Sequence, residues 1–201
     1  WLRFESLIGH KLALDGLPNA PAVLADVAKI YVNALALDEE QSVVLFKAIL
    51  KEYVFEFINL NGVTDGVYLE ASFSSDGGSS YGITKTTTAF RTRHDEANTT
   101  AVLGYSASDD IAQGTGSQNL SGTGVSNAAD EASCGELHLF NPASTTYVKN
   151  FYNIQQTGAN TWSYGMFVAG YLNTTSAVNA VKFDLYSGNI NAGTIKMYGI
   201  K

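Results

Sequence analysis

The stretch that decides the fold is residues 66–73, Gly-Val-Tyr-Leu-Glu-Ala-Ser-Phe. The apolar residues at 67, 69, 71 and 73 share one face of an extended chain, as they do in a half-buried β-strand. The sequence Asp76-Gly77-Gly78 follows, and it is typical of the tight turn at the tip of a hairpin. This stretch therefore predicts a strand that buries one face and ends in a turn.

Short extended segments separated by turn residues continue to the end of the chain. In residues 136–140 the alternation places Leu137 and Leu139 inward. Residues 91–99 are charged and turn-like, and residues 113–127 are rich in Gly, Ser and Asn, which predicts a flexible loop at an exposed end. The other predicted strands are 53–58, 81–90, 101–105, 147–155, 165–171, 180–187 and 193–200. Because no helical segment separates these strands, we expect an antiparallel sandwich or jelly roll rather than a parallel α/β sheet.

The first quarter of the chain has a different composition from the rest. All 17 threonines and 17 of the 19 glycines lie after Glu56. Such a change of composition is typical of two structural regions. We therefore divide the chain into an N-terminal region, residues 1–55, and a β-domain, residues 56–201.

The N-terminal region is predicted to form an arm and two short α-helices. The arm is residues 1–17, and the first helix begins at Pro21, a residue suited to the first helical turn. The second helix, roughly residues 39–51, follows Asp38 as its N-cap and is apolar on most sides. Such a helix must be buried, either under the β-domain or against copies of itself, and we favour the second. The expected oligomer-interface residues are Val44, Leu45, Ala48 and Ile49.

Charge and composition exclude several classes of function. A net charge of −7 argues against nucleic acid and against an anionic membrane surface as partners. No apolar run reaches the roughly 18 residues that a membrane span needs, so we expect no membrane insertion. The single cysteine, Cys134, excludes an internal disulfide framework and a cysteine-based zinc site. The chain begins at Trp1 rather than Met, which is typical of a processed or truncated product.

Candidate catalytic and metal-binding residues are few. The tripeptide His94-Asp95-Glu96 could hold a metal or a general base, but it fits a solvated turn better, and Cys134-x-Glu136-x-His138 is not a zinc spacing. The acid pairs at 109–110 and 130–131 flank the Gly-rich segment, and carboxylates about 5–9 Å apart can hydrolyse glycosides. Acids in loops are more often simply solvated. With no P-loop and no nucleophile elbow, we expect no enzymatic activity, no cofactor and no metal site.

Aromatic residues give a better functional indication. In residues 155–164, Gln-Gln-Thr-Gly-Ala-Asn-Thr-Trp-Ser-Tyr, rings stand beside amides and hydroxyls in a segment that we predict to be a loop. Sugars stack on aromatic rings while amides bind their hydroxyls, so this segment is a candidate glycan site. The alternative is that these rings fill the core or a subunit interface. The candidate glycan-binding residues are Gln156, Asn160, Trp162 and Tyr164.

Four segments of the second half occur in a fixed order. They are Asp76-Gly-Gly-Ser-Ser-Tyr81, Gly135-Glu-Leu-His-Leu-Phe-Asn-Pro142, Ala177-Val-Asn-Ala-Val-Lys-Phe183 and Ser187-Gly-Asn-Ile-Asn-Ala-Gly-Thr-Ile-Lys-Met-Tyr-Gly-Ile200. Together they resemble the pattern of a β-sandwich domain common at the C-termini of tailed-bacteriophage virion proteins, which include tail fibres, head fibres and decoration proteins. The last segment is the most specific, and its glycines suit a tight corner before a final strand. The resemblance covers about residues 55–201 and not the N-terminal region.

The resemblance implies a jelly-roll-like fold and a non-enzymatic structural role on the surface of the virion, as a fibre or decoration subunit. It also implies self-association as a homotrimer, with the N-terminal region contacting other capsid or tail proteins. Two other functions stay open at this point. One is the host-receptor-binding tip of a tail fibre, which would recognise a surface glycan. The other is a secreted carbohydrate-active or carbohydrate-binding module.

Overall fold

The computed structural model describes residues 42–45 and 50–200. These residues are 56% strand and contain no helix, so the fold is mainly β, as predicted. Accordingly, the described ranges hold no helix of the length and hydropathy that a membrane span requires. The predicted arm and the predicted first helix lie outside the described residues.

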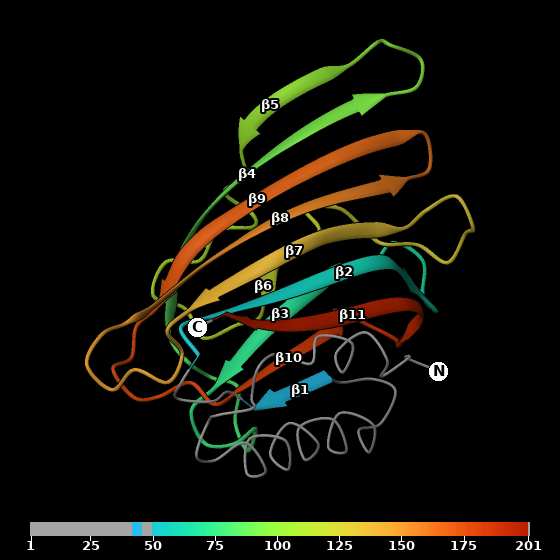
Figure 1. Cartoon of the computed structure of the whole chain (residues 1–201). Coiled ribbons are helices and arrows are strands. Elements are labelled where there is room, and N and C mark those ends of the chain that lie inside the picture. Colours follow the sequence, from blue (N-terminus) through green and yellow to red (C-terminus); the bar gives the residue numbers. More distant parts are fainter. Residues whose placement is uncertain (1–41, 46–49, 201) are drawn as a thin grey trace. The chain divides into compact units, whose positions relative to one another are not determined.

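The strands form two antiparallel sheets, which Figure 1 shows. The four-stranded sheet has the order β1 (Ser42–Leu45), β10 (Ala180–Leu185), β3 (Leu69–Ser74) and β6 (Gln118–Asn119). The seven-stranded sheet has the order β11 (Ile190–Ile200), β2 (Glu52–Gly62), β7 (Ser133–Phe140), β8 (Lys149–Ala159), β9 (Trp162–Leu172), β4 (Lys85–Asp95) and β5 (Ala101–Tyr105). Pairing is nested along the chain, because β2 pairs with β11, β3 with β10 and β4 with β9.

The two sheets pack face to face around aromatic side chains. Phe183 of β10 meets Phe55 and Phe57 of β2 edge to face, with ring centroids 4.9 and 5.0 Å apart. Phe73 of β3 meets Phe151 of β8 at 5.3 Å. We call the side of the seven-stranded sheet that carries these rings its inner face and the opposite side its outer face.

The inward positions predicted from the sequence are confirmed. The side chains of Val67, Leu69, Ala71 and Phe73 are all buried, as are those of Leu137 and Leu139. The predicted corner before the last strand is confirmed at Gly188, which has a φ of +74°, whereas Gly193, with a φ of +111°, lies inside β11 at an irregularity in its pairing with β2. The alternation of apolar residues was therefore sufficient to orient these strands.

Residues 42–45 show that the predicted helix over residues 39–51 is wrong at its centre. They form strand β1, in which Val44 lies opposite Val181 and Leu45 opposite Ala180 of β10. A short apolar run rich in valine fits a buried strand as well as a helix, and here the edge of β10 offers it hydrogen-bond partners. Ala48 and Ile49 lie outside the described residues. The change of composition near residues 53–57 falls within β2.

The prediction of an exposed loop over residues 113–127 holds for residues 113 and 115–117, which are exposed, but is wrong for residues 118–126, most of which are buried. Leu120 is fully buried, and the Gln118 side chain accepts a hydrogen bond from the Thr87 hydroxyl at 2.8 Å. The Asn153 amide of β8 donates to the Leu120 carbonyl at 3.0 Å. The part from Gln118 onward therefore packs on polar residues of the inner face, and Gly122 and Gly124 in it are closely packed.

Two predicted turns are placed differently by the structure. Strand β4 continues to Asp95, so most of the charged stretch 91–99 is strand and only its end is turn. The segment Asp76-Gly77-Gly78 connects β3 to β4, which belong to different sheets, and so it is not the tip of a hairpin. In both cases local composition indicated a turn, but the strand partners are set by residues far away in the sequence.

The connection between β3 and β4 is organised around the carboxylate of Asp76. It accepts hydrogen bonds from the Ser74 hydroxyl at 2.6 Å, from the Ser80 N–H at 2.9 Å and from the Ser80 hydroxyl at 2.7 Å. The bond from Ser74, followed by those from Ser80, lowers the pKa of Asp76 to about 2. Hydrogen bonds to the charged form of a carboxyl group favour that form.

Replacing Asp76 by asparagine should therefore lower the thermal stability in a pH-dependent way. Because the folded-state pKa lies below the ordinary value of 3.8, the carboxylate stabilises the fold above about pH 4, and this contribution is lost as the pH falls toward 2. The difference in melting temperature between wild type and Asp76→Asn should thus be largest above pH 4 and shrink toward pH 2. Asp130→Asn, at an exposed loop position, controls for the loss of one negative charge. A difference that stays constant from pH 5 to pH 2 would contradict this role.

Candidate functional site

The outer face of the seven-stranded sheet carries a row of aromatic side chains, which we call the aromatic row. Its members are Phe90 of β4, Phe167 of β9, Tyr152 of β8, and His138 and Phe140 of β7. Each stands at an outward position of its strand, and the register places Phe90 opposite Phe167 and His138 opposite Tyr152. Three consecutive strands, β7, β8 and β9, and the sequence-distant β4 thus build one continuous feature.

The rings of the aromatic row stack on one another. Phe90 and Phe167 have centroids 4.8 Å apart with an interplanar angle of 25°, and His138 and Tyr152 are 4.4 Å apart at 14°. Phe167 and Tyr152 join the two pairs at 6.4 Å and 15°. Side chains on a sheet stand roughly perpendicular to it, so rings stacked in this way cover each other's faces and turn their edges to the solvent.

His138 ties the aromatic row to two carboxylates. Its Nδ1 lies 2.6 Å from Oε1 of Glu52, and its Nε2 lies 3.2 Å from Oε1 of Glu136. The His138 Nε2 is buried and makes no hydrogen bond to another described residue. Burial, followed by the negative charges of Glu136 and Glu52, raises the pKa of the neighbouring Tyr152. Two carboxylates thus lie against one imidazole beside the row.

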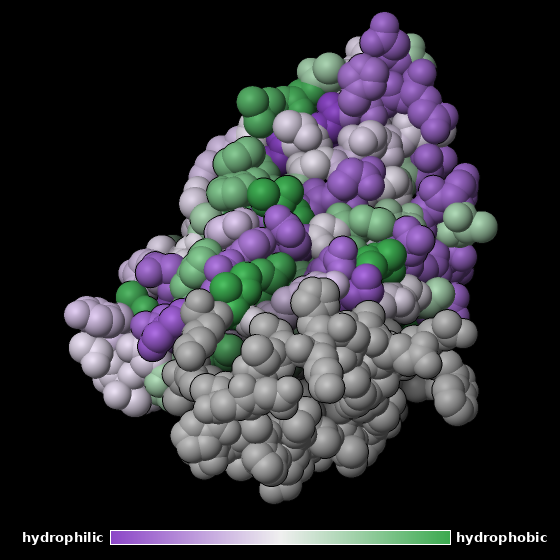
Figure 2. All heavy atoms as spheres, viewed as in Figure 1, coloured by the Kyte–Doolittle hydropathy of each residue, from purple (hydrophilic) through white to green (hydrophobic). Residues whose placement is uncertain are grey.

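Exposed apolar side chains surround the aromatic row on the outer face. Leu103 and Tyr105 of β5 are 71% and 61% exposed, and Ile154 of β8 is 49% exposed. On the opposite edge strand, β11, Tyr198 and Ile200 are also exposed. Figure 2 views this side of the sheet and shows hydrophobic residues interspersed with hydrophilic ones. The outer face is therefore mixed in polarity, with its apolar groups spread over several strands.

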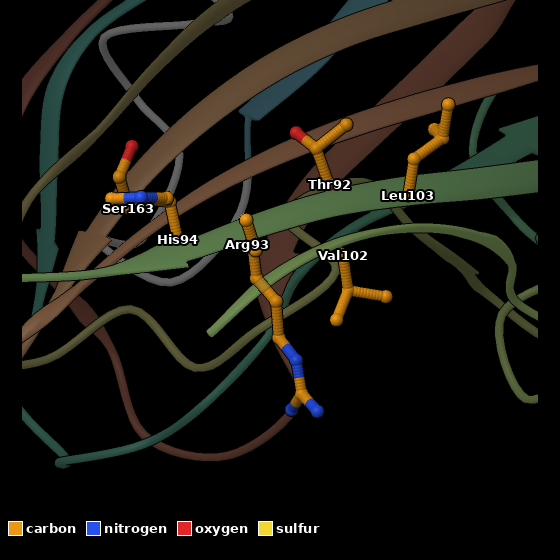
Figure 3. Close-up of a pocket in the computed structure, with 7 residues that line it drawn as sticks. Thr92, Arg93, His94, Val102, Leu103 and Ser163 are labelled. Atoms are coloured by element: carbon orange, nitrogen blue, oxygen red, sulfur yellow. The ribbon is translucent and has the colours of Figure 1, made fainter. Parts of the chain in front are cut away.

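A shallow hollow of about 380 Å³ lies beside the aromatic row, between β4, β5 and β9. Figure 3 shows Thr92, Leu103 and Ser163 on one side of the β4–β5 pair, and Arg93 and Val102 pointing to the other. Thr92 packs closely on Gly165 of β9, because a Cβ at position 165 would lie 2.7 Å from the Thr92 hydroxyl oxygen. The lining of the hollow mixes hydroxyl, nitrogen-bearing and apolar side chains.

The structure does not bring the four predicted glycan-binding residues together. Residues 155–164 are not a loop, because β8 and β9 form a hairpin whose turn is at Asn160, with φ of +54°. Trp162 and Tyr164 stand on the inner-face side with centroids 6.1 Å apart, and the Arg93 guanidinium lies 5.4 Å from the Trp162 ring. Gln156 is exposed on the outer face, on the other side of the sheet.

The acidic residues considered as catalytic groups bind their own loops. The Asp109 carboxylate accepts hydrogen bonds from the Asn119 amide at 2.8 Å and from the Ser106 hydroxyl. Asp95 is buried and accepts from the backbone N–H groups of Thr99 and Thr100, both at 2.8 Å. Asp95 is therefore a turn-closing residue rather than part of a solvated tip, and Asp109 is not a freely solvated loop acid.

The remaining candidates from the sequence have structural contacts. Cys134 stands on the outer face, where its thiol lies 3.2 Å from the Asn59 side-chain oxygen and 3.2 Å from the Asn59 N–H. His94 lies 3.2 Å from the Asn98 side-chain oxygen. Within residues 42–45 and 50–200, no group of three or more His, Cys, Asp and Glu side chains is placed to hold a metal ion.

The sequence analysis missed the aromatic row. Phe90, Tyr152 and Phe167 each occupy the outward position of an alternating segment, which is a signal that could have been noticed. Their assembly into a stack depends on the register among β4, β9, β8 and β7, and no local pattern encodes that register.

No family model matches the chain, and neither the curated proteins nor the solved structures contain a significant match.

Proposed function

We propose that this chain is a non-enzymatic structural protein of a tailed-bacteriophage particle, a fibre or decoration subunit exposed on the virion surface. The proposal starts from the resemblance of four ordered segments in the β-domain. It includes self-association as a trimer and attachment to other capsid or tail proteins through the N-terminal region. It also includes a jelly-roll-like fold, which is supported by the nested pairing of β2 with β11, β3 with β10 and β4 with β9.

The observation that carries the proposal is the spatial meeting of the segments behind the resemblance. The Asn179 side chain accepts a hydrogen bond from the Gly77 N–H at 2.9 Å, which joins the first segment to the third. The Val178 N–H donates to the Pro142 carbonyl at 2.8 Å, which joins the third segment to the second. The fourth segment forms β11 and pairs with β2 next to β7. These residues make turns and strand contacts, so the segments behave as determinants of a fold.

Two further observations favour a structural role over the alternatives. Asp95 and Asp109 use their carboxylates to close loops, which disfavours them as the acid pair of a glycosidase. The stacked rings of the aromatic row turn edges rather than faces to solvent, whereas a sugar stacks on a ring face. Carboxylates that bind their own loops, and rings that stack on each other, favour a structural role over catalysis or sugar binding.

Immunogold labelling tests this proposal. Antibodies raised against the purified chain are applied to purified particles of the phage that encodes it. We expect labels at a fixed position on the particle surface, in a number per particle that is constant. Particles stripped of the chain by mild denaturant should lose the label and provide the control. Absence of the chain from carefully purified particles, by labelling and by mass spectrometry of their proteins, would contradict the proposal.

A further inference from the structure

We propose that the outer face of the seven-stranded sheet is the surface that packs against a neighbouring copy of this chain. The inference rests on the proposed function, which includes self-association, and it assigns that association to a particular surface. The occupant is a second copy rather than a glycan or an unrelated protein. Four properties of the outer face lead to this assignment.

The first property is the concentration of exposed apolar groups. Of the twelve large hydrophobic side chains that are exposed within the described residues, six stand on the outer face. They are Phe90, Leu103, Tyr105, Ile154, Tyr198 and Ile200. The exposed tyrosines elsewhere, such as Tyr147 and Tyr186, lie in separate loops. Apolar groups gathered on one sheet face are typical of a protein interface.

The second property is rigidity. The rings of the aromatic row hold each other in place, with centroid separations of 4.8 Å for Phe90 and Phe167 and 4.4 Å for His138 and Tyr152. Ordering these side chains on association therefore costs little conformational entropy. Ring edges also pack well against the rings and aliphatic side chains of a neighbouring copy, because aromatic edges and faces carry opposite partial charges.

The third property is that the charged groups of the outer face are paired within it. Lys196 lies 3.3 Å from Glu56, and the Tyr198 hydroxyl donates to the same glutamate at 3.0 Å. His138 lies between Glu52 and Glu136. The Lys196–Glu56 pair thus lowers the net charge that an approaching copy meets on this part of the face.

The fourth property is area. Strands spaced about 4.8 Å apart, with a rise of about 3.3 Å per residue, give this sheet a footprint of about 1,000 Å². A stable protein–protein interface buries about 800 Å² on each partner. The outer face alone is therefore large enough to bury that area against a neighbouring copy.

Sedimentation velocity of the full chain and of two outer-face variants tests the proposal. Leu103→Lys and Ile154→Lys each place a charge on a side chain that is already largely exposed, so folding should be preserved, and circular dichroism checks this. The double variant, which carries both substitutions, should raise the concentration at which half of the chains are associated by at least about 30-fold. The matched control is Tyr186→Lys, at a residue that is 72% exposed outside the outer face, and it should change that concentration by less than about 3-fold.

Cys134 provides a local measurement on the same face. In the associated wild type its alkylation should be slower than in the double variant, whereas Tyr186→Lys should behave as wild type. A wild type that is monomeric throughout the micromolar range would overturn the proposal. The proposal would also fail if the outer-face variants sediment as the same associated species as the wild type. Specific binding of the monomer to a glycan array, abolished by the same two variants, would assign the face to a sugar instead.

These experiments use purified protein and are independent of the particle. If phage particles lack the chain but association is lost only in the outer-face variants, the proposed function fails and the interface stands. If particles carry the chain but the outer-face variants associate normally, the interface fails and the proposed function stands.

Discussion

Phe183→Ala should lower the free energy of unfolding by about 3–5 kcal/mol, the largest effect that we expect from a single substitution. Phe183 is fully buried and meets Phe55 and Phe57 edge to face, so it joins the two sheets through direct ring contacts. Truncation removes the transfer free energy of the ring and leaves a cavity between sheets that cannot easily close. Chemical denaturation, followed by circular dichroism, measures this loss.

The matched control for this prediction is Phe90→Ala on the outer face. Phe90 is 41% exposed and has one close ring partner, so its truncation should cost less than about 1.5 kcal/mol. If both variants lose the same free energy of unfolding, the packing of the two sheets around Phe183 does not contribute more to stability than the outer face does.

Lys85→Met should raise the free energy of unfolding at pH 7 by about 2 kcal/mol. The Lys85 side chain is fully buried on the inner face, where its Nζ donates to the Ile83 carbonyl at 3.4 Å. Among the described residues, no carboxylate lies within ion-pair distance of it. Burial lowers the pKa of Lys85 to about 8, which means that the folded state disfavours the ammonium form.

The pH dependence of this effect has a definite sign. Between the folded-state pKa of about 8 and the ordinary value of 10.5, the unfolded chain binds more protons at Lys85 than the folded chain does. The stability of the wild type should therefore rise with pH across this window, relative to that of Lys85→Met, so that the advantage of the variant shrinks from pH 7 to pH 10. Denaturation at several pH values measures both chains under identical conditions.

Lys149→Met is the matched control. Lys149 is also buried on the inner face, and burial lowers its pKa, but its Nζ donates to two carbonyls, those of Tyr147 at 3.0 Å and Thr174 at 3.2 Å. Removing this lysine leaves two acceptors unpaired, so it should stabilise less than removing Lys85 or should destabilise. A Lys85→Met variant that is less stable than wild type at pH 7 would contradict our account of this buried ammonium.

The alternation of apolar residues predicted much of the β-domain, because a strand with one buried face has a period of two. The inward positions of Leu69, Phe73, Leu137 and Leu139 followed directly from it. The same reasoning failed for residues 42–45, because a short run such as Val43-Val44-Leu45 does not distinguish a strand from a helix. Only the pairing with β10 decides between them.

Glycine content and register account for the other differences. Residues 113–127 have the composition of a flexible loop, yet Leu120 and Gln118 are fully buried, because Gln118 pairs with β3 as part of β6 and the segment packs on the inner face of the seven-stranded sheet. The aromatic row depends on how β4, β9, β8 and β7 are aligned, which is a long-range property. For the same reason the predicted glycan residues Gln156 and Trp162, although close in sequence, stand on opposite sides of the sheet.

The central claim is that this chain is a surface subunit of a phage particle that packs against its own copies. A cryo-electron microscopy map of the particle, with the two-sheet β-domain fitted into it, tests this claim most directly. We predict density for the domain at the particle surface, with the outer face of the seven-stranded sheet turned toward a neighbouring copy. A map in which the domain is absent, or in which each copy stands isolated with this face open to solvent, would contradict the account.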